Sequence, residues 1–437
     1  MPSTDTPDAA PPAVTSIPHQ LHNKFALLAH QSLFRVAWIF KTESVIMPAF
    51  LDSISESGFI RGALPLLNRT GQSLAPLMLA SRLSTTPLKT AWLSRTTFLM
   101  GMPFLFLSGS VYFADAKLPE WFAAVFLIAY VTFFCLHGVN DMTLSTVLGK
   151  LIVARERGRL QAAASTIGTT AAVSLALLLL SGWLQRPGQA PFQPIFLFVG
   201  SVMMLAGVSS KLLREQPDAT FKVSESLNPH TAFRLAFQRI AADPVLRRLC
   251  MVAVLFVSSQ TLFPHYQKVG LARQTGARTV LMDWVIAQHL GAVCFSMASG
   301  FLADRFGTRA ALRLLLPCAA FAPVLAILLE MHASPRWFWI TFFWIGLVPV
   351  TLRVLVNYLI EIVTRDKHPE YISTLNLCMA APFLCSPLLG ALVDWTGHVL
   401  PFLIVAAAVG LGAVLTLVMQ EPRHAVSGNE SGRTPET

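Results

Sequence analysis

Long apolar runs and short polar segments alternate along almost the whole chain. Each apolar run is long enough for an α-helix to cross roughly 30 Å of hydrocarbon, which takes about 20 residues. We predict membrane-spanning helices over residues 31–52, 58–80, 91–113, 121–147, 161–184, 194–213, 248–267, 280–302, 312–331, 337–362, 372–393 and 399–420. The pattern therefore predicts an all-α membrane protein with twelve transmembrane helices.

The composition supports the membrane class. Apolar residues make up 54% of the 437 residues, and charged residues make up only 13%. A soluble domain usually carries about twice that charged share, roughly 25%, and needs it to cover its surface with polar groups. A chain with so few charges is better suited to a lipid bilayer, which we expect to surround the spans.

The formal net charge of +10 would suit a nucleic-acid-binding protein, but the placement of the charges indicates otherwise. If the N-terminus lies inside, most loop lysines and arginines fall on the inner side, as do Lys150, Arg155 and Arg157 after the fourth span. The outer loops carry fewer, such as Lys117 and Arg186. Because positive loops stay in the cytoplasm, we predict two cytoplasmic termini, a bacterial inner membrane and no nucleic-acid partner.

The sequence contains no motif that indicates catalysis or a bound cofactor. The six cysteines fall within or at the ends of predicted spans, so they predict neither a disulfide framework nor a metal site. Serine-hydrolase, phosphate-binding-loop and zinc-protease motifs are absent from the sequence. We expect no enzymatic activity and no cofactor, so an ion or substrate gradient must supply the energy for any transport.

A charged segment separates the eighth and ninth predicted spans and has the sequence Gly300-Phe301-Leu302-Ala303-Asp304-Arg305-Phe306-Gly307-Thr308-Arg309-Ala310-Ala311-Leu312. Glycine near each end can free the backbone to leave one helix and enter the next, while aspartate suits a helix N-terminus and arginine suits acidic partners. The segment resembles the loop signature of the major facilitator superfamily, Gly-x-Leu-Ala-Asp-Arg-x-Gly-Arg-Arg-x-x-Leu. The matching residues are Gly300, Leu302, Ala303, Asp304, Arg305, Gly307, Arg309 and Leu312, and Thr308 replaces one expected basic residue.

The resemblance implies two pseudo-symmetric six-helix bundles around a central cavity that opens to each side of the membrane in turn. Sequence echoes at a shared offset support a duplicated unit: Glu215-Gln216-Pro217 follows the sixth span, and Gln420-Glu421-Pro422 follows the twelfth. The predicted segments are a disordered cytoplasmic tail (1–24), a first bundle (25–213), a cytoplasmic central loop with a short amphipathic helix (214–247), a second bundle (248–422) and a disordered tail (423–437).

Ionisable groups inside a membrane helix cost roughly 2.5–3.5 kcal/mol each on insertion scales, so they are usually functional or paired. In the family architecture, spans 1, 4, 7 and 10 line the cavity, and Glu43, Asp141, His265 and Arg353 fall one on each. The resemblance therefore implies a polar binding site and a proton-coupling acid. The competing interpretation is structural, with Arg353 paired to Asp141 or snorkelling to the membrane surface, and the charges of the first two spans neutralising one another.

Glu43 is the best candidate for the proton carrier because it lies nearest the middle of a cavity span. Lys41 is two residues away and should point elsewhere on a continuous helix, so Arg69 in the second span is the expected partner of Glu43. Arg353, followed one helical turn later by Asn357, would suit an anionic group of the substrate.

The charged segment should also close the cytoplasmic side of the cavity. In that closed state we expect Asp304 near the start of the eleventh span, at residues 370–373, and Arg305 or Arg309 near Glu361. Gly300 and Gly307 complete this predicted gating motif.

Two classes of function compete. The first is a monomeric secondary active transporter that moves a small solute by alternating access, coupled to a proton or another ion, with efflux of amphipathic compounds and uptake of an organic anion both open. The second is a protein of the same fold that does not transport and acts as a receptor or membrane assembly scaffold. An aromatic, weakly polar cavity would favour efflux, whereas an unpaired Arg353 facing a spacious pocket would favour anion uptake.

Overall fold

A computed structural model describes residues 19–114, 117–217, 229–272, 279–364 and 367–421. All regular secondary structure in these ranges is helical. The first half of the chain forms α1 (Gln20–Phe40), α2 (Ile46–Asp52), α3 (Gly58–Thr85), α4 (Lys89–Tyr112), α5 (Phe122–Leu151), α6 (Ala154–Leu175), α7 (Ser181–Trp183) and α8 (Phe192–Ser209). The second half forms α9 (Pro229–Ala242), α10 (Pro244–Val257), α11 (Phe263–Ala272), α12 (Val280–Phe306), α13 (Thr308–His332), α14 (Trp339–Ile345), α15 (Val348–Ile362), α16 (His368–Leu384), α17 (Ser386–Thr396) and α18 (Val399–Leu415).

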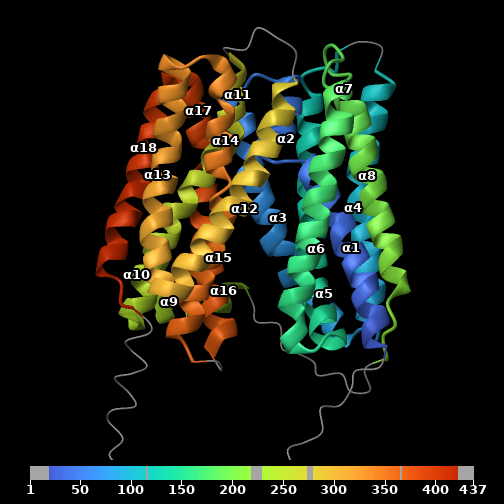
Figure 1. Ribbon diagram of the computed structural model, residues 1–437, viewed down its shortest axis with the longest axis vertical. Coiled ribbons are helices and arrows are strands. Elements are labelled where there is room, and N and C mark those ends of the chain that lie inside the picture. The colour runs from blue at the N-terminus through green and yellow to red at the C-terminus, as the bar shows by residue number, and fades with distance from the viewer. Residues whose placement is uncertain (1–18, 115–116, 218–228, 273–278, 365–366, 422–437) are drawn as a thin grey trace, which may run out of the picture.

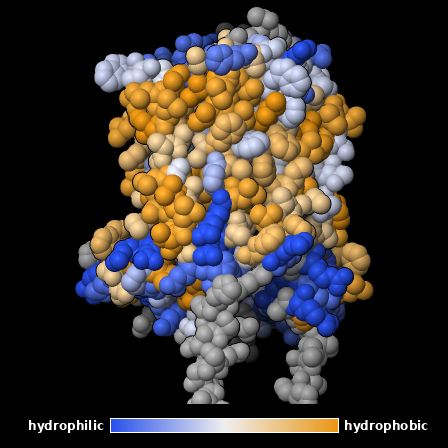
Figure 2. Space-filling model, turned by 60° about the vertical axis from the view of Figure 1, so that its left-hand side comes forward, coloured by the Kyte–Doolittle hydropathy of each residue, from blue (hydrophilic) through white to orange (hydrophobic). Residues whose placement is uncertain are grey.

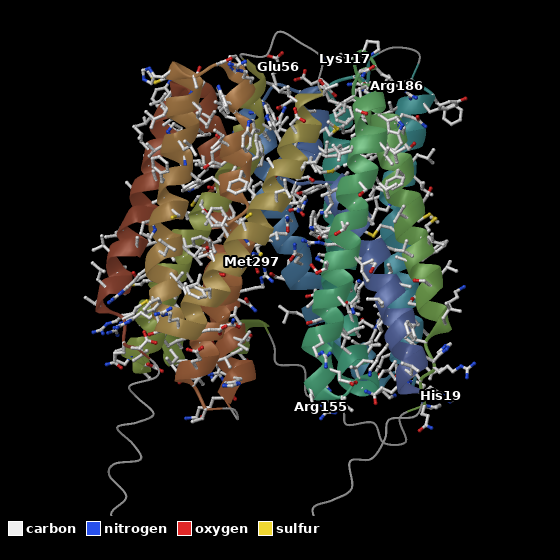
Figure 3. The ribbon with its side chains drawn as sticks, in the orientation of Figure 1. His19, Glu56, Lys117, Arg155, Arg186 and Met297 are labelled. Atoms are coloured by element: carbon white, nitrogen blue, oxygen red, sulfur yellow. The ribbon has the colours of Figure 1, made fainter. Side chains whose placement is uncertain are left out.

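The helices form two bundles, one from each half of the chain. Figure 1 shows the blue-to-green first half on one side and the yellow-to-red second half on the other. Figure 2 shows a broad belt of hydrophobic residues between two ends where hydrophilic residues gather. His19 and Arg155 lie at the lower end in Figure 3, whereas Glu56, Lys117 and Arg186 lie at the upper end. The predicted inner and outer loops are therefore found at opposite ends of the molecule.

Nine helical segments of the described ranges, all from Phe122 onwards, are long and apolar enough to cross a membrane. The helices before Phe122 run between the same two ends (Figure 1), with α1 and α2 forming one pass and α3 and α4 one pass each. The all-helical fold is consistent with the twelve predicted passes. In a bilayer, only a helix or a closed barrel satisfies every backbone hydrogen bond of a spanning segment.

The first predicted span, 31–52, is not one continuous helix. α1 ends at Phe40 and α2 begins at Ile46. In an unbroken helix, the ring of Pro48 would clash with the carbonyl four residues earlier, but in the first turn of a new helix it is tolerated. The hydroxyl of Thr42 donates to the carbonyl of Ile39 and satisfies one group at the break. The ring of Phe50 then packs against Phe196, with ring centroids 4.8 Å apart, which holds α2 in the first bundle.

Irregular turns interrupt other spans at the level of the same break. A short 3₁₀ turn, Ser258–Leu262, joins α10 to α11, and Gly346 and Leu347 separate α14 from α15. Backbone of this kind is tolerated at membrane depth only where protein buries it or where it lines a cavity. Gln260 and Gly346 both line the central cavity described below.

The signature segment contains less loop than its sequence suggests. α12 continues through Gly300, Asp304 and Arg305 to Phe306, and α13 begins at Thr308. The turn is Gly307 alone, whose φ of 90° is a backbone conformation that other residues rarely adopt. The expectation that glycine at each end frees the backbone is therefore correct for Gly307 and wrong for Gly300, which stays helical.

Several segment boundaries differ from the prediction. α1 begins at Gln20, inside the predicted tail, because Asn23 binds the backbone of Arg214 twice, at 2.9 and 2.8 Å, and so ties α1 to the end of α8. The rest of both predicted tails, 1–18 and 423–437, lies outside the described residues. α9 coincides with the predicted amphipathic helix, and Arg239 attaches it to Glu370 on α16 at 2.7 Å.

The two halves meet at the upper end through very close backbone contacts. The N–H of Gly58 on α3 donates to Asp394 on α17 at 2.5 Å. A Cβ placed on Gly390 would lie 1.9 Å from the carbonyl oxygen of Gly58, so glycine is required for this approach. A Cβ on Gly62 would likewise lie 2.4 Å from the carbonyl oxygen of Ser386.

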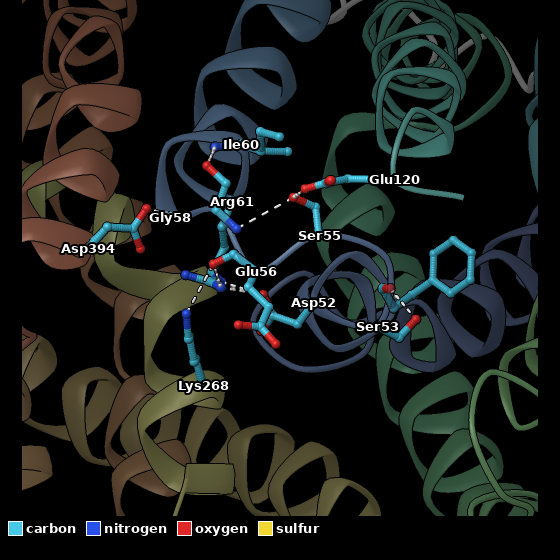
Figure 4. Close-up of polar contacts among 12 residues, drawn as sticks. Asp52, Ser53, Ser55, Glu56, Gly58, Ile60, Arg61, Glu120, Lys268 and Asp394 are labelled. Carbon is cyan, nitrogen blue, oxygen red and sulfur yellow. Dashed lines mark hydrogen bonds and ion pairs between the residues drawn. The ribbon is translucent and has the colours of Figure 1, made fainter. Parts of the chain in front are cut away.

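A buried ion pair lies beside these glycines. Figure 4 shows Arg61 and Lys268 gathered around the loop that connects α2 to α3. Arg61 has no exposed surface and holds Asp52 at 2.5 Å. Arg61 and Lys268, which come from different halves, both donate to the carbonyl of Glu56 at 3.1 Å. The upper end is therefore closed by contacts between the halves.

Candidate functional site

A cavity of about 620 Å³ lies between the two halves. α1, α3, α5 and α6 line it from the first half, and α11, α12, α15 and α16 line it from the second. Arg353 lines the cavity and is nevertheless exposed, so the cavity is open to the outside of the protein. The contacts between Gly58 and Asp394 and between Lys268 and Glu56 join the halves at the upper end, so the opening faces the lower end.

The charges of the cavity are unbalanced. Three arginines line it, Arg35, Arg69 and Arg353. Glu43 is the one carboxylate among the described residues of the lining. Its charge is already bound by Lys41, with Nζ and Oε1 2.7 Å apart. The cavity therefore carries a surplus of positive charge.

The ion pair of Glu43 corrects the expected partner. Lys41 is the direct partner, whereas Arg69 attracts Glu43 electrostatically without a hydrogen bond between them among the described contacts. The expectation that Lys41 points elsewhere assumed a continuous helix, and the break after Phe40 removes that assumption. In a non-helical turn, residues two apart can face the same side.

Aromatic rings enclose the ammonium group of Lys41. Its Nζ lies 3.5 Å from the ring centre of Trp38, 4.7 Å from that of Phe133 and 4.6 Å from that of Phe134. Ring faces attract cations, and the attraction grows where water is excluded. The side chain of Lys41 is only 1% exposed, so these rings and Glu43 take the place of water around its charge.

Amide groups extend the network from Glu43 across the cavity. Asn68 donates to Oε2 of Glu43, and Gln72 donates to the side-chain oxygen of Asn68. Ser44, next to Glu43, donates to Gln288 on α12 in the other half. Glu43 is thus bonded to α3 of its own half, and the next residue, Ser44, contacts the other half.

The remaining arginines are weakly held. Arg35 donates to the hydroxyl of Thr169 at 3.3 Å. The guanidinium of Arg69 lies 5.2 Å from the ring centre of Phe383. Arg353 has no hydrogen bond or ion pair to any other described residue, so the predicted alternative of an Arg353–Asp141 pair does not occur in this structure.

Three predicted site residues lie outside the cavity lining. Asp141 on α5 and Asn357 on α15 are exposed side chains that do not line it. His265 on α11 is only 1% exposed and lies in the upper contact region, near the charges of Arg61 and Lys268. The sequence placed these residues on helices that line the cavity, but their side chains lie at another height of the helix or on another face, away from the lining.

The gating motif makes different contacts from those expected for the closed lower end. In this open state, Glu361 accepts a hydrogen bond from Thr308 at 2.5 Å, and Arg309 pairs with Glu421 at 3.1 Å. Arg305 lies beside its neighbour Phe306, with 5.5 Å between the guanidinium and the ring centre. Glu421 was not predicted from the sequence as a partner of Arg309. The repeated Glu-Gln-Pro and Gln-Glu-Pro segments could have indicated it, since Glu215 in the first half also binds a basic residue, Lys150, at 2.8 Å.

Sequence reasoning also missed Arg35, His289 and two glutamines, Gln260 and Gln288, of the cavity lining. Arg35 could have been found, since it is an ionisable residue within a predicted span. The uncharged residues carried no comparable signal, because a lone histidine or amide in a span is usually a packing group.

Comparison with known proteins agrees with this architecture. The sequence profile described as the Major Facilitator Superfamily matches residues 44–352 and 269–436. Among solved structures, the nucleoside transporter NupG is 14% identical, with 92% of this chain and 99% of that chain covered and a TM-score of 0.64. A D-xylose–proton symporter is 15% identical, with 92% and 98% covered and a TM-score of 0.64.

A bacterial homologue of the human lysosomal transporter Spinster, described as inward-facing and occupied, is 14% identical, with 96% and 100% covered and a TM-score of 0.61. At these identities the structures are evidence of a shared fold alone. No curated protein matches the sequence. Fold and family profile together define a multi-pass membrane protein with a transporter fold. The chain belongs to the Major Facilitator Superfamily.

Proposed function

We propose that the protein is a secondary active transporter that takes up a small organic anion together with a proton. The observation that carries this proposal is the surplus of positive charge in the cavity, where three arginines line the wall with a single carboxylate. Guanidinium groups bind carboxylate or phosphate through paired hydrogen bonds. Efflux of amphipathic compounds is less well supported, because a cavity for such compounds would be weakly polar, whereas this one is lined by charged groups.

Glu43 supplies the proton coupling in this proposal. When Glu43 is ionised, it neutralises Lys41 at 2.7 Å and attracts Arg69. When Glu43 takes up a proton, these cations lose their counter-ion, which is unfavourable because the side chain of Lys41 is buried. An anionic substrate restores the balance. Proton and anion therefore favour each other's binding and cross the membrane together.

The orientation follows from the loop charges. The loop around Arg155 lies at the lower end (Figure 3), it also contains Lys150 and Arg157, and loops rich in positive charge stay in the cytoplasm. We therefore assign the lower end, with both termini, to the cytoplasm of a bacterial cell and the protein to its inner membrane. In this assignment the cavity is open inwards. The gating motif then closes the cavity at the lower end during the return step.

Transport by purified protein in liposomes tests the proposal. A panel of small organic anions is offered outside, with and without an inward proton gradient, and uptake is measured. The gradient should drive accumulation in the unaltered protein. Glu43→Gln should abolish that accumulation and leave exchange of anion for anion largely intact, because a glutamine cannot gain or lose the proton. Glu330→Gln, on α13, is the control and should behave normally, because its carboxylate lies outside the cavity, 3.8 Å from Nε2 of His398.

Continued accumulation by Glu43→Gln would make Glu43 a structural partner of Lys41 and place the coupling acid elsewhere. The receptor or scaffold alternative makes a different prediction. Under that alternative no anion is transported, and the distance between labels on the two halves does not respond to any of them. Anion flux through the unaltered protein excludes it.

A further inference from the structure

Two arginines repel each other across the cavity from opposite halves of the protein. Arg35 lies on α1 in the first half, and Arg353 lies on α15 in the second. Both line the same cavity, so the positive charge of Arg353 acts on Arg35. Glu43, the carboxylate of the described lining, is engaged by Lys41 and Arg69 instead. The Arg35–Arg353 pair is therefore uncompensated in the empty cavity.

Two further polar groups in the cavity wall also lack a partner. Nε2 of His289 and Nε2 of Gln260 are buried, and neither has a hydrogen-bond partner among the described residues. His289 lies close enough to Arg35 to feel its charge. Buried polar atoms are nearly always hydrogen-bonded, so each of these side chains would gain from an acceptor oxygen within reach. Amide nitrogen is a donor, and imidazole nitrogen can donate, so both side chains suit a ligand with acceptor oxygens.

We propose that Arg35 and Arg353 clamp, from the two halves, an organic anion that carries at least two negative charges. This inference rests on the proposed anion transport and narrows its substrate class. A single negative charge would leave one member of the pair uncompensated. Two charges neutralise the pair, and two carboxylates, or a phosphate monoester, also provide enough acceptor oxygens for His289 and Gln260.

The clamp explains how the anion would favour closure of the lower end. The halves already touch where Ser44 donates to Gln288, and Arg35 lies below that level, nearer the start of α1. Closing the lower end brings α1 and α15 together beneath this contact. Repulsion between two cations grows as their separation and the water between them decrease. An empty cavity therefore resists closure, and a doubly charged anion removes the resistance.

Binding of matched pairs of anions tests the charge requirement. The full-length protein in lipid nanodiscs is titrated with succinate against its monoamide, succinamate, and with phenyl phosphate against methyl phenyl phosphate. Within each pair the two compounds are similar in size and differ by one charge. The doubly charged compound of at least one pair should bind about tenfold or more tightly than its partner, which is the effect expected when one cation is left unpaired.

Equal binding of both members of a pair that binds would overturn the inference and leave anion transport standing. Failure of all four compounds and of the wider anion panel to bind or to be transported would overturn both. Arg35→Gln and Arg353→Gln should each reduce the ratio of the two affinities, doubly over singly charged, to about one. Arg353→Lys keeps the charge and should retain the preference, which tests the clamp even if the glutamine variants fold poorly. Arg336→Gln, at the upper end beside Trp337, is the control.

A distance measurement separates the clamp from a merely structural role. Spin labels are placed by Gly158→Cys on α6 and Ser373→Cys on α16, with Cys294 and Cys385 replaced by serine because both are exposed. A doubly charged anion that binds should shorten the lower-end distance, and its singly charged partner should not. Arg353→Gln should shorten it without any anion, because the repulsion is gone. An unchanged distance in Arg353→Gln, in correctly folded protein, would contradict the proposed resistance to closure.

Discussion

Replacing Gly390 by alanine should hold the upper end of the protein open. The added Cβ would lie 1.9 Å from the carbonyl oxygen of Gly58 and 2.6 Å from its carbonyl carbon. These atoms belong to α3 in the first half, whereas Gly390 belongs to α17 in the second. No change of side-chain rotamer can remove the overlap, because the opposing atoms are backbone. The halves must separate instead.

The size of the effect follows from this geometry. Carbon and oxygen atoms in close backbone contact are normally about 3.3–3.6 Å apart, so the halves must move by roughly 1.4 Å or more at this point. Overpacking of this kind typically costs about 1–3 kcal/mol. Since 1.4 kcal/mol is a factor of ten in an equilibrium, the ratio of the upper-closed to the upper-open state should fall about 5- to 150-fold. The higher helix propensity of alanine stabilises the upper-closed and upper-open states equally, so it does not change the ratio between them.

Distances between spin labels at the upper end measure this shift. Lys117→Cys and Arg336→Cys place labels on the two halves, in the loops before α5 and after α13. Gly390→Ala should add or enlarge a population with a longer distance. Gly410→Ala on α18 is the matched control, because nothing lies within 4 Å of its added Cβ. An unchanged upper-end distance in Gly390→Ala would refute the idea that the close Gly58–Gly390 contact governs closure.

Two further changes test the buried contacts. Asp52→Asn should favour the upper-open state, because it leaves the fully buried Arg61 without its counter-ion, at a cost of about 3–5 kcal/mol when the charge stays buried. The double variant Asp52→Leu/Arg61→Met should recover much of the closed population in the same label measurement. Gly307→Ala should lower the free energy of unfolding by about 1–2 kcal/mol or more, since the φ of Gly307 is 90° and an added Cβ would lie 2.2 Å from Glu421. Gly300→Ala should be neutral or slightly stabilising, because Gly300 is helical and open space surrounds its added Cβ. Equal thermal stability of the two alanine variants would contradict the assigned turn.

The sequence by itself determined the class of protein and most of its helices. Hydropathy identifies spans because every turn that faces lipid must be apolar, and this requirement acts locally along the chain. The signature segment identified the family for the same reason, since Gly307 and its neighbours act within a single turn between two helices. The general position of Glu43 and Arg353 inside spans was also readable, because a charge in an apolar run is conspicuous.

The tertiary structure decided which of these charges act together. The Lys41–Glu43 pair depends on a helix break at residues 41–45, where Pro48 and contacts of Phe50 with distant helices outweigh the apolar pattern. The clamp joins Arg35 to Arg353, which no local pattern relates because their proximity depends on how the two halves pack. His265 was expected in the cavity, yet it lies among the upper contacts. Spans follow from local hydrophobicity, whereas partners follow from the packing of whole bundles.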